Sequence, residues 1–538
     1  MRVMPSTRAR PHVVWAAVGV FVLTWSVRYM SLVGFPNDHF LYLAPAQQML
    51  AGELPSRDFV DPGTPLMYAV SAIARLVVDA PLLAEALVVS TAFALAAALT
   101  VYAAFIASGT LGIAVAVAVV QVAMFPRSYH YPKLLLYAVG VLAIWRYTAE
   151  PSARRALLVG ACIVVAFLFR HDHGVYLTAA ALIAAVIARP EWRGAIPRVS
   201  LMAGIVALLA SPYLVFVATV TGFAQHFASG AAYSRSEIGR AIAGLPAFDW
   251  SEVLSAQNLL LWLFYIFHLV PVVAIAVLIR RRAWARPDRS DWVRMLPVAV
   301  LAVAANMMLL RDPLDARLPD VAVPIGVLGA WLIPQPWRGK GGWFVAGRVL
   351  VLVLAGACLA GANVIGRPAE QLDRAVLLTR PARVLAHARS VLAELQMSFH
   401  EGHLPSRVTK TLVPFMEYVG RCTAPHQRLF VAGDAPEIYV FARRLFAGGQ
   451  PALRNGFFSS IDDQERLVSR LRRQDVPLAL VLTEGDARLF TVVMAELDAG
   501  FQSVREIIVE GQGVVDVRVN RRARMNRLDE STGLPCFT

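Results

Sequence analysis

Residues 81–107 read PLLAEALVVSTAFALAAALTVYAAFIA, and this run decides the class of fold to which the chain belongs. A transmembrane helix needs about 20 predominantly apolar residues, so a run of this kind is long enough to cross a bilayer. Of the 538 residues, 57% are hydrophobic and 16% are charged, which is too apolar a balance for one water-soluble domain. The sequence therefore predicts a polytopic α-helical membrane protein.

The same criterion, relaxed for shorter runs that flank polar loops, predicts about eleven transmembrane helices. They are expected at residues 13–33, 81–107, 111–125, 132–147, 156–169, 174–188, 199–221, 259–279, 295–310, 321–333 and 343–365. The first run is longer than the apolar region of a signal peptide, and no small-residue cleavage site follows it, so we expect it to be retained.

Two further apolar stretches leave the topology open. Residues 40–50 and 64–79 are expected to form amphipathic helices that lie on the membrane surface, because the second is short and contains Arg75. If residues 64–79 span the membrane instead, the orientation of every later helix reverses.

The net charge of +14 would suggest a nucleic-acid partner in a soluble protein. Here the arginines collect in short loops at 154–155, 189–198, 280–294 and 338–348, and these loops all fall inside if the N-terminus is cytoplasmic. We therefore expect no nucleic-acid partner and a multi-pass membrane protein with a cytoplasmic N-terminus; the bacterial inner membrane is what the family resemblance given below implies. The loops left outside are 34–79, 126–131, 171–173, 222–258 and 311–320.

The composition changes after residue 365. We expect residues 1–365 to form the transmembrane catalytic domain, with 34–79 as its first external loop, and residues 366–411 to form an amphipathic linker. In residues 412–538, strand-like and helix-like segments alternate, which predicts a small external, periplasmic α/β domain. Cys422 and Cys536 both lie in this domain, where a disulfide is permitted, but their spacing alone does not establish one.

The first external loop begins with Phe35-Pro36-Asn37-Asp38-His39-Phe40. A transfer reaction that displaces a lipid phosphate needs a carboxylate base for the incoming hydroxyl, and positive charge for the departing phosphate. Asp38 is the candidate base, with a helix cap or loop residue as the alternative interpretation. Asp58 and Asp61, close to Pro62 and Pro65, are expected to shape turns.

The candidate cations for the phosphate are arginines of the external loops, because a guanidinium group matches phosphate oxygens: Arg57, Arg170, Arg235, Arg311 and Arg317. Asp172 is the candidate second carboxylate, which would orient the acceptor or hold Arg170. The other candidates are His39, His171, His173 and Tyr233, the last in a long loop that could close over a bound lipid.

The sequence favours a polar turn that lines the site over a metal centre at His171 and His173. His171 and His173 would point to nearly opposite faces of a helix, so only an extended connection would let both reach one ion. No cofactor is certain from the sequence, and a divalent metal stays possible.

At the level of motifs, the first loop resembles a known family. Asp38 is followed by a surface helix, by Gly-Glu-Leu-Pro-Ser-Arg-Asp-Phe from position 52 and by Pro-Gly-Thr-Pro-Leu from position 62. This arrangement resembles the bacterial branch of the glycosyltransferase C (GT-C) superfamily, which includes protein O-mannosyltransferases and aminoarabinose transferases of lipid A. The resemblance implies that Asp38 is the base, that the donor is a polyprenyl-phosphate sugar and that the anomeric carbon inverts. The usual acidic pair of the loop is here Asp38-His39.

Two classes of function therefore compete. One is an inverting glycosyltransferase that moves a sugar from a polyprenyl-phosphate donor to a lipid, glycan or protein acceptor at the outer face of the inner membrane. The other is a transporter or flippase of a lipid-linked or small polar solute. A transporter is expected to carry polar or broken helices near the middle of the membrane, often in two related halves. The predicted spans are mostly alanine, leucine and valine without an internal repeat, which favours the enzyme.

Overall fold

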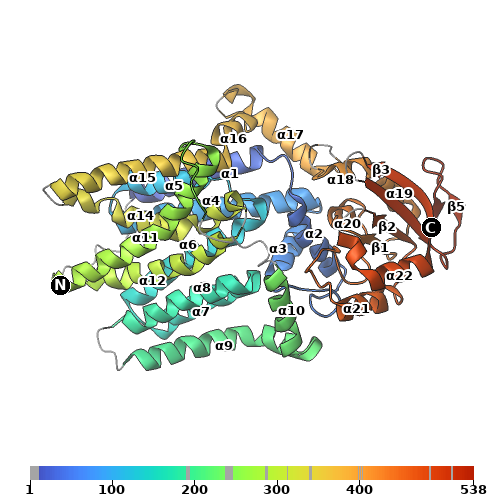
Figure 1. Ribbon diagram of the computed structural model, residues 1–538, viewed down its shortest axis with the longest axis horizontal. Helices are drawn as coiled ribbons and strands as arrows, with labels where there is room; N and C mark the ends of the chain where they lie inside the picture. The colour runs from blue at the N-terminus through green and yellow to red at the C-terminus, as the bar shows by residue number, and fades with distance from the viewer. Residues whose placement is uncertain are drawn as a thin grey trace. The chain divides into compact units, whose positions relative to one another are not determined.

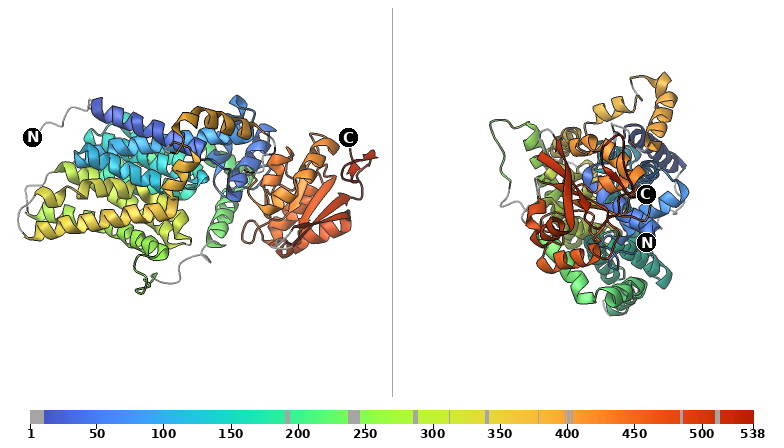
Figure 2. Two further views of the ribbon diagram at one scale, coloured as in Figure 1. Left: turned by 90° about the horizontal axis from the view of Figure 1, so that it is seen from above. Right: turned by 90° about the vertical axis from the view of Figure 1, so that its right-hand side faces the viewer.

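The computed structural model describes residues 11–189, 194–236, 246–284, 289–311, 313–338, 342–377, 379–397, 399, 402, 404–483, 486–509 and 513–538. The chain divides into two compact units (Figures 1 and 2). The first, the helical unit, comprises Met1–Ser31, Val89–Pro212 and Arg240–Ala388. The second, the mixed unit, comprises Leu32–Val88, Tyr213–Gly239 and Arg389–Thr538.

Each of the eleven predicted spans coincides with a helix: α1 (Pro11–Met30), α4 (Pro81–Ser108), α5 (Leu111–Ala123), α6 (Tyr131–Ala149), α7 (Ala153–Phe169), α8 (His171–Ile187), α9 (Ala195–Val220), α11 (Ala256–Trp284), α12 (Arg289–Asn306), α14 (Ala322–Leu332) and α15 (Gly342–Gly366). Within the described ranges, seven helical segments are long and apolar enough to cross a membrane. The prediction of a polytopic helical membrane protein is therefore confirmed, whereas the number of spans is not fixed at eleven.

The stretch at 64–79 forms α3 (Pro65–Val77), a helix of 13 residues. At 1.5 Å per residue it extends about 20 Å, which is shorter than the ~30 Å hydrocarbon core of a bilayer. This helix alone is therefore too short to cross an undistorted membrane.

Short irregular helices join the long helices of the helical unit. They are η1 (Ser128–His130) before α6, and the sequence η4 (Met307–Leu310), α13 (Leu314–Arg317) and η5 (Leu318–Val321) between α12 and α14. Proline stands in the first turn of both α6 and η5, where its missing N–H has no helical partner in any case. Several of the polar residues discussed below lie in these connections.

The mixed unit contains a four-stranded sheet in the order β1-β2-β4-β3, formed by β1 (Leu429–Ala432), β2 (Leu478–Leu482), β4 (Gly513–Asn520) and β3 (Phe501–Val509). β1 pairs with β2 in parallel, and the other neighbours are antiparallel. α21 (Ile461–Leu471) buries Gln464, Leu467, Val468 and Leu471, one face at helical spacing. With α22 (Thr491–Gly500) it encloses a core that includes Phe430, Phe490 and Leu497. The predicted α/β architecture of this region is confirmed.

The first loop packs against the C-terminal domain within the mixed unit. The ring of Phe40, in α2 (Asn37–Leu50), lies 5.5 Å from that of Phe441, in α20 (Glu437–Phe441). The side chain of Gln48 donates a hydrogen bond of 2.9 Å to the carbonyl oxygen of Phe446. The backbone N–H of Val60 donates a hydrogen bond of 2.9 Å to the carbonyl oxygen of Gly449. The candidate base is thus carried by a loop that the C-terminal domain holds in place.

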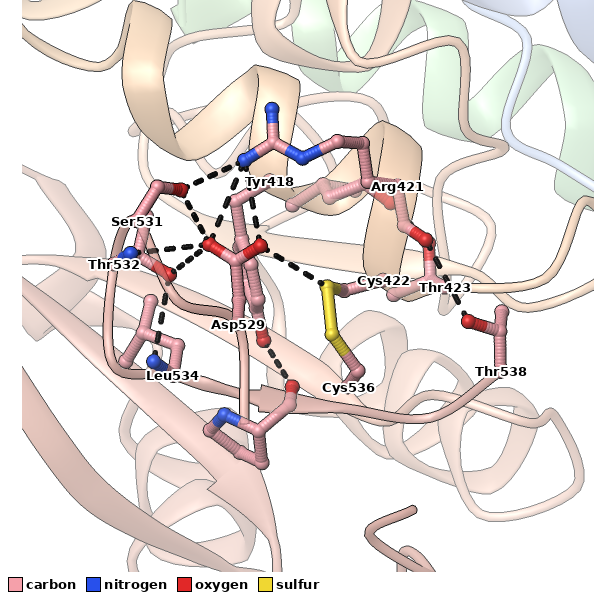
Figure 3. The surroundings of a disulfide bond; sticks show 12 residues. Tyr418, Arg421, Cys422, Thr423, Asp529, Ser531, Thr532, Leu534, Cys536 and Thr538 are labelled. Atoms are coloured by element: carbon pink, nitrogen blue, oxygen red, sulfur yellow. Dashed lines mark hydrogen bonds and ion pairs between the residues drawn. A yellow bond between two sulfur atoms is a disulfide. The ribbon is translucent and has the colours of Figure 1, made fainter. Parts of the chain in front are cut away.

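A disulfide joins Cys422, at the end of α19 (Val413–Cys422), to Cys536, in β6 (Pro535–Cys536), as Figure 3 shows. The two residues are separated by 114 positions in the sequence. Beside the bond, Arg421 donates to Ser531 over 2.9 Å and faces the carboxylate of Asp529 (Figure 3). The pairing that the sequence only permitted is therefore present, and it ties the C-terminal residues to α19.

Candidate functional site

Asp38 lies in the first turn of α2, directly after Pro36 and Asn37. A negative charge is favourable there because the N–H groups of the first turn point toward it. Its Oδ1 accepts a hydrogen bond of 3.0 Å from a terminal nitrogen of Arg454, and 43% of the Asp38 side chain is exposed. The carboxylate is therefore both held by a partner and accessible to a substrate.

Arg454 joins Asp38 to a second carboxylate, Asp434. Its Nε donates to Asp434 over 2.9 Å, and its terminal nitrogen lies 2.7 Å from the same carboxylate. Burial raises the pKa of Asp434, while Arg454 opposes that rise. Burial acts to lower the pKa of Arg454, but the two carboxylates outweigh it and raise that pKa above its ordinary value. Arg454 is therefore a permanently charged bridge between the first loop and the turn after β1.

His39, the departure from the usual acidic pair, points into the protein. Its side chain is fully buried, and its Nε2 lies 2.7 Å from a carboxylate oxygen of Glu85, in α4. The ring also packs 4.6 Å from that of Phe35. This pairing with Glu85 gives His39 an internal structural role beside the accessible Asp38.

In the helical unit, a buried carboxylate carries two cationic partners. Asp320, in η5, is fully buried, and its two oxygens lie 2.5 Å from Nζ of Lys133 and 2.7 Å from Nδ1 of His130. Lys133 stands in the first turn of α6, directly after η1. An ionisable group at such a position is a functional candidate by default, because its desolvation is costly.

Two arginines lie near Lys133. Lys133 interacts electrostatically with both Arg170 and Arg317. Arg170, between α7 and α8, lies 2.9 Å from Asp172, and holding Arg170 is one of the two roles considered for this carboxylate. Tyr176 interacts electrostatically with Arg170 and with Arg311. The structure thus places Arg170 and Arg317, both predicted as site residues, near Lys133, which was not predicted. Asp172 joins this group through Arg170, and Arg311 lies near Tyr176.

Arg317 brings a buried donor to this group. Nε of Arg317 is buried and has no hydrogen-bond partner among the described residues. A buried donor without a partner costs about 1–3 kcal/mol, so an anionic ligand that accepts from it would remove a penalty. This cationic cluster, defined as Lys133, Arg170 and Arg317, is therefore suited to a phosphate.

The two histidines of α8 have separate surroundings. Nδ1 of His173, a buried residue, lies 2.5 Å from the hydroxyl of Tyr137, and the ring of His171 stacks on Phe167 at 4.2 Å. Within the described residues, the one group of three potential metal ligands whose atoms lie within 4.8 Å of one another is Cys422, Asp529 and Cys536, and its two thiols form the disulfide.

The remaining candidates lie in the mixed unit. Arg57 is paired with Asp58 at 2.7 Å and also donates to the carbonyl oxygen of Gly52. Arg235, on the exposed end of α10 (Phe223–Ser236), donates to Ala231 one turn back. Tyr233 belongs to the same helix, but its side chain lies outside the described residues.

The aspartates expected to shape turns do so. Asp58 accepts from the N–H of Leu54 at 2.8 Å, and Asp61 accepts from the N–H groups of Gly63 and Thr64 at 2.9 and 2.8 Å. Both are used by the backbone of the first loop, as the clustered prolines indicated.

Sequence reasoning missed Lys133, His130, Asp320, Glu85 and Arg454. Lys133 could have been identified from the sequence, because it is one of only three lysines and stands at the start of a predicted span. Glu85 carried a signal of the same kind, as an ionisable residue inside the apolar run at 81–107. Arg454 lies in an irregular segment among many surface arginines, and no local pattern distinguishes it.

The arrangement defines a polytopic membrane protein whose polar side chains gather at helix ends, with a small α/β domain holding its first loop. No family model and no curated protein matches the sequence. Among solved structures, the chain has the fold of ArnT from Cupriavidus metallidurans bound to undecaprenyl phosphate, with a TM-score of 0.51 and 14% identity, covering 96% of this chain and 100% of that one. The apo form of the same protein matches with a TM-score of 0.48 and 13% identity, over 94% and 98% of the two chains. The chain thus shares its fold with the first of these structures.

Proposed function

We propose that the protein is an inverting glycosyltransferase (EC 2.4 class) that moves a sugar from a polyprenyl-phosphate donor to a lipid, glycan or protein acceptor. The observation that carries the proposal is the cationic cluster of the helical unit, in the fold of a protein solved with undecaprenyl phosphate. The cluster stands at the ends of apolar helices, where a lipid phosphate would have its head in a polar site and its tail in hydrocarbon.

In the proposed reaction, the acceptor hydroxyl attacks the anomeric carbon while Asp38 takes its proton. The bond between that carbon and the phosphate oxygen breaks, and the oxygen leaves with the electron pair. Lys133, Arg170 and Arg317 would stabilise the charge that develops on the phosphate, which is the larger need because a phosphate is a good leaving group without general acid catalysis. The accessible position of Asp38 and its contact with Arg454 support its role as the positioned base.

We further propose that the N-terminus is cytoplasmic, and that the first loop and the C-terminal domain face the periplasm. The arginine-rich loops support this orientation. The disulfide between Cys422 and Cys536 supports it independently, because disulfides persist in oxidising compartments such as the periplasm.

The test is transfer by the purified full-length protein from undecaprenyl-phosphate sugars of defined composition to membrane acceptors. We expect Asp38→Asn to lower the transfer rate by about 10²–10⁴-fold. Asp475→Asn is the matched control, because Asp475 is an exposed aspartate of the same unit. Transfer that survives Asp38→Asn unchanged would remove Asp38 from the mechanism. Failure of every donor, together with solute uptake by reconstituted vesicles, would favour the transporter.

A further inference from the structure

The last hairpin of the mixed unit carries a basic surface that the proposed reaction does not use. In it β5 (Arg527–Leu528) pairs with β6 in antiparallel fashion, and Figure 2 shows it beside the C-terminus. Residues 521–528 read RRARMNRL, with four arginines and no acidic residue, and the first exposed acid after them is Glu530. We define the basic hairpin face as the exposed arginines and large apolar residues of this stretch: Arg521, Arg522, Arg524, Met525, Arg527 and Leu528.

The charge of this face is not neutralised by neighbouring carboxylates. Other arginines of the C-terminal domain are paired: Arg472 lies 2.5 Å from Glu496, and Arg518 lies 2.6 Å from Asp498. Of the four arginines of the face, Arg522 interacts electrostatically with Glu496, which Arg472 already holds. Within the described ranges, no ion pair joins any of the four to a carboxylate. Like charges held close together repel one another, so an anionic partner would stabilise this face.

The backbone that carries the face is fixed. A hairpin of two such short strands is not stable by itself in water. Here the disulfide between Cys422 and Cys536 ties β6 to α19, and the N–H of Asn526 donates a hydrogen bond of 2.9 Å to the carbonyl oxygen of Cys536. The carboxylate of Asp529, which is 8% exposed, accepts from the N–H of Thr532 at 3.0 Å (Figure 3). The arginines are therefore presented on a preformed surface.

Two large apolar side chains stand among these arginines. Met525 is 60% exposed and Leu528 is 58% exposed. Single exposed apolar residues are common on protein surfaces, but these two alternate with cations on one short hairpin. Segments that lie at a bilayer surface have this composition, because the apolar side chains enter the boundary of the acyl layer while the basic groups contact lipid phosphates.

We propose that the basic hairpin face docks on the surface of an anionic phospholipid bilayer, with its arginines at the lipid phosphates and Met525 and Leu528 at the acyl boundary. A free inorganic phosphate would leave the two apolar side chains in water. A bilayer without net charge would leave the repulsion among the arginines in place. An acidic peptide or a nucleic acid would pair with the arginines but offers no acyl layer. Docking requires no sugar transfer, so the proposal does not rest on the proposed function.

Vesicle flotation tests the proposal with the full-length protein in nanodiscs of neutral phosphatidylcholine. The probes are separate vesicles of phosphatidylcholine, with and without phosphatidylglycerol. Hydrogen exchange at residues 521–528, in nanodiscs with and without phosphatidylglycerol and with no vesicles, detects docking on the bilayer that holds the protein. We expect phosphatidylglycerol to increase flotation at least tenfold or to slow exchange in this segment, and high salt to reverse the effect. No effect of phosphatidylglycerol in either measurement would overturn the proposal.

Two variants separate the charged from the apolar contribution. Arg521→Gln/Arg522→Gln/Arg524→Gln should weaken binding by about 10²-fold, because each arginine contributes to attraction by an anionic surface. Met525→Ser/Leu528→Ser should weaken binding as well, while the salt dependence stays. Both variants should keep the thermal unfolding midpoint of the wild type, because they leave the disulfide and Asp529 in place.

The matched control removes three exposed arginines of α21 and the turn after it, Arg466→Gln/Arg472→Gln/Arg473→Gln, and so changes the net charge by the same amount. We expect it to bind as the wild type does. An equal loss in this control would reduce the effect to general net charge and overturn the proposal. Binding that Met525→Ser/Leu528→Ser leaves unchanged, and that a DNA oligonucleotide abolishes, would show a general polyanion surface instead of a lipid-docking one.

Discussion

A terminal nitrogen of Arg454 lies 3.0 Å from Oδ1 of Asp38, although 416 positions separate the two residues in the sequence. The same guanidinium contacts Asp434 at 2.7 Å. The C-terminal domain therefore supplies a charged partner to the candidate base of the first loop. Arg454 is a positioning residue in the proposed mechanism, and this role separates it from a residue that only supports folding.

Replacing Arg454 by glutamine should lower kcat by about 10²-fold, because a misplacement of about 1 Å at a reacting group can cost that much. Arg454→Lys should recover part of the loss, since it restores the charge without the fork of the guanidinium. KM for the donor should change little. Steady-state transfer assays measure kcat and KM separately and so detect this difference. The control is Arg472→Gln, which removes an exposed arginine paired with Glu496. Equal losses in the Gln and Lys variants, with thermal unfolding shifted in both, would indicate a purely structural role.

Replacing Lys133 by methionine should weaken binding of undecaprenyl phosphate at least tenfold and leave the weaker interaction with undecaprenol unchanged, because only the phosphate loses a cation. The single change also removes a buried partner of Asp320, which should destabilise the protein by about 3–5 kcal/mol.

The double variant Lys133→Met/Asp320→Asn separates the two effects, because it removes both charges. We expect it to regain stability without regaining affinity. Lys410→Met, at an exposed lysine of the mixed unit, is the control. Full phosphate affinity in the double variant would remove Lys133 from the donor site.

Features that depend on local sequence could be predicted, whereas features that depend on tertiary contacts could not. The apolar runs require helices wherever water is excluded, and each predicted span coincides with a helix. Arg170, Arg311 and Arg317 stand at loop positions that hydropathy alone identifies. The pairings of Arg454 with Asp38 and of Glu85 with His39 depend on which elements meet in space, and one sequence carries no such information. Their distances could not be predicted for that reason.

Removal of the disulfide should selectively weaken the C-terminal domain. Closing a loop of this length contributes typically 2–4 kcal/mol by restricting the unfolded chain, so Cys422→Ser/Cys536→Ser should lose a comparable amount. Limited proteolysis of the full chain, with and without reductant, measures the loss. Cys162→Ser/Cys358→Ser is the control, because both of those cysteines are free. Identical proteolysis of the wild type in both conditions would contradict the prediction.

Glu437 should make the stability of the C-terminal domain depend on pH. It is 1% exposed, and burial raises its pKa from the ordinary 4.5 to about 7, although a hydrogen bond of 2.6 Å from Thr409 acts the other way. Below pH 4.5 the group is protonated in both the folded and the unfolded state. Between pH 4.5 and 7 only the unfolded state gains by ionisation, so the free energy of unfolding falls by about 3 kcal/mol, and above pH 7 the loss is complete.

Glu437→Gln should therefore flatten this dependence, since glutamine keeps the acceptor for Thr409 and does not ionise. Pulse proteolysis of the full-length protein in urea at pH 5 and pH 8 measures the free energy of unfolding of the domain. We expect the variant to lose less stability than the wild type between the two values. The control is Glu417→Gln, at a half-exposed glutamate of α19, which should retain the wild-type slope. If Glu437→Gln also retains that slope, Glu437 does not titrate between pH 4.5 and 7, and the fall in stability originates at another buried carboxyl such as Asp61, whose pKa burial raises to about 6.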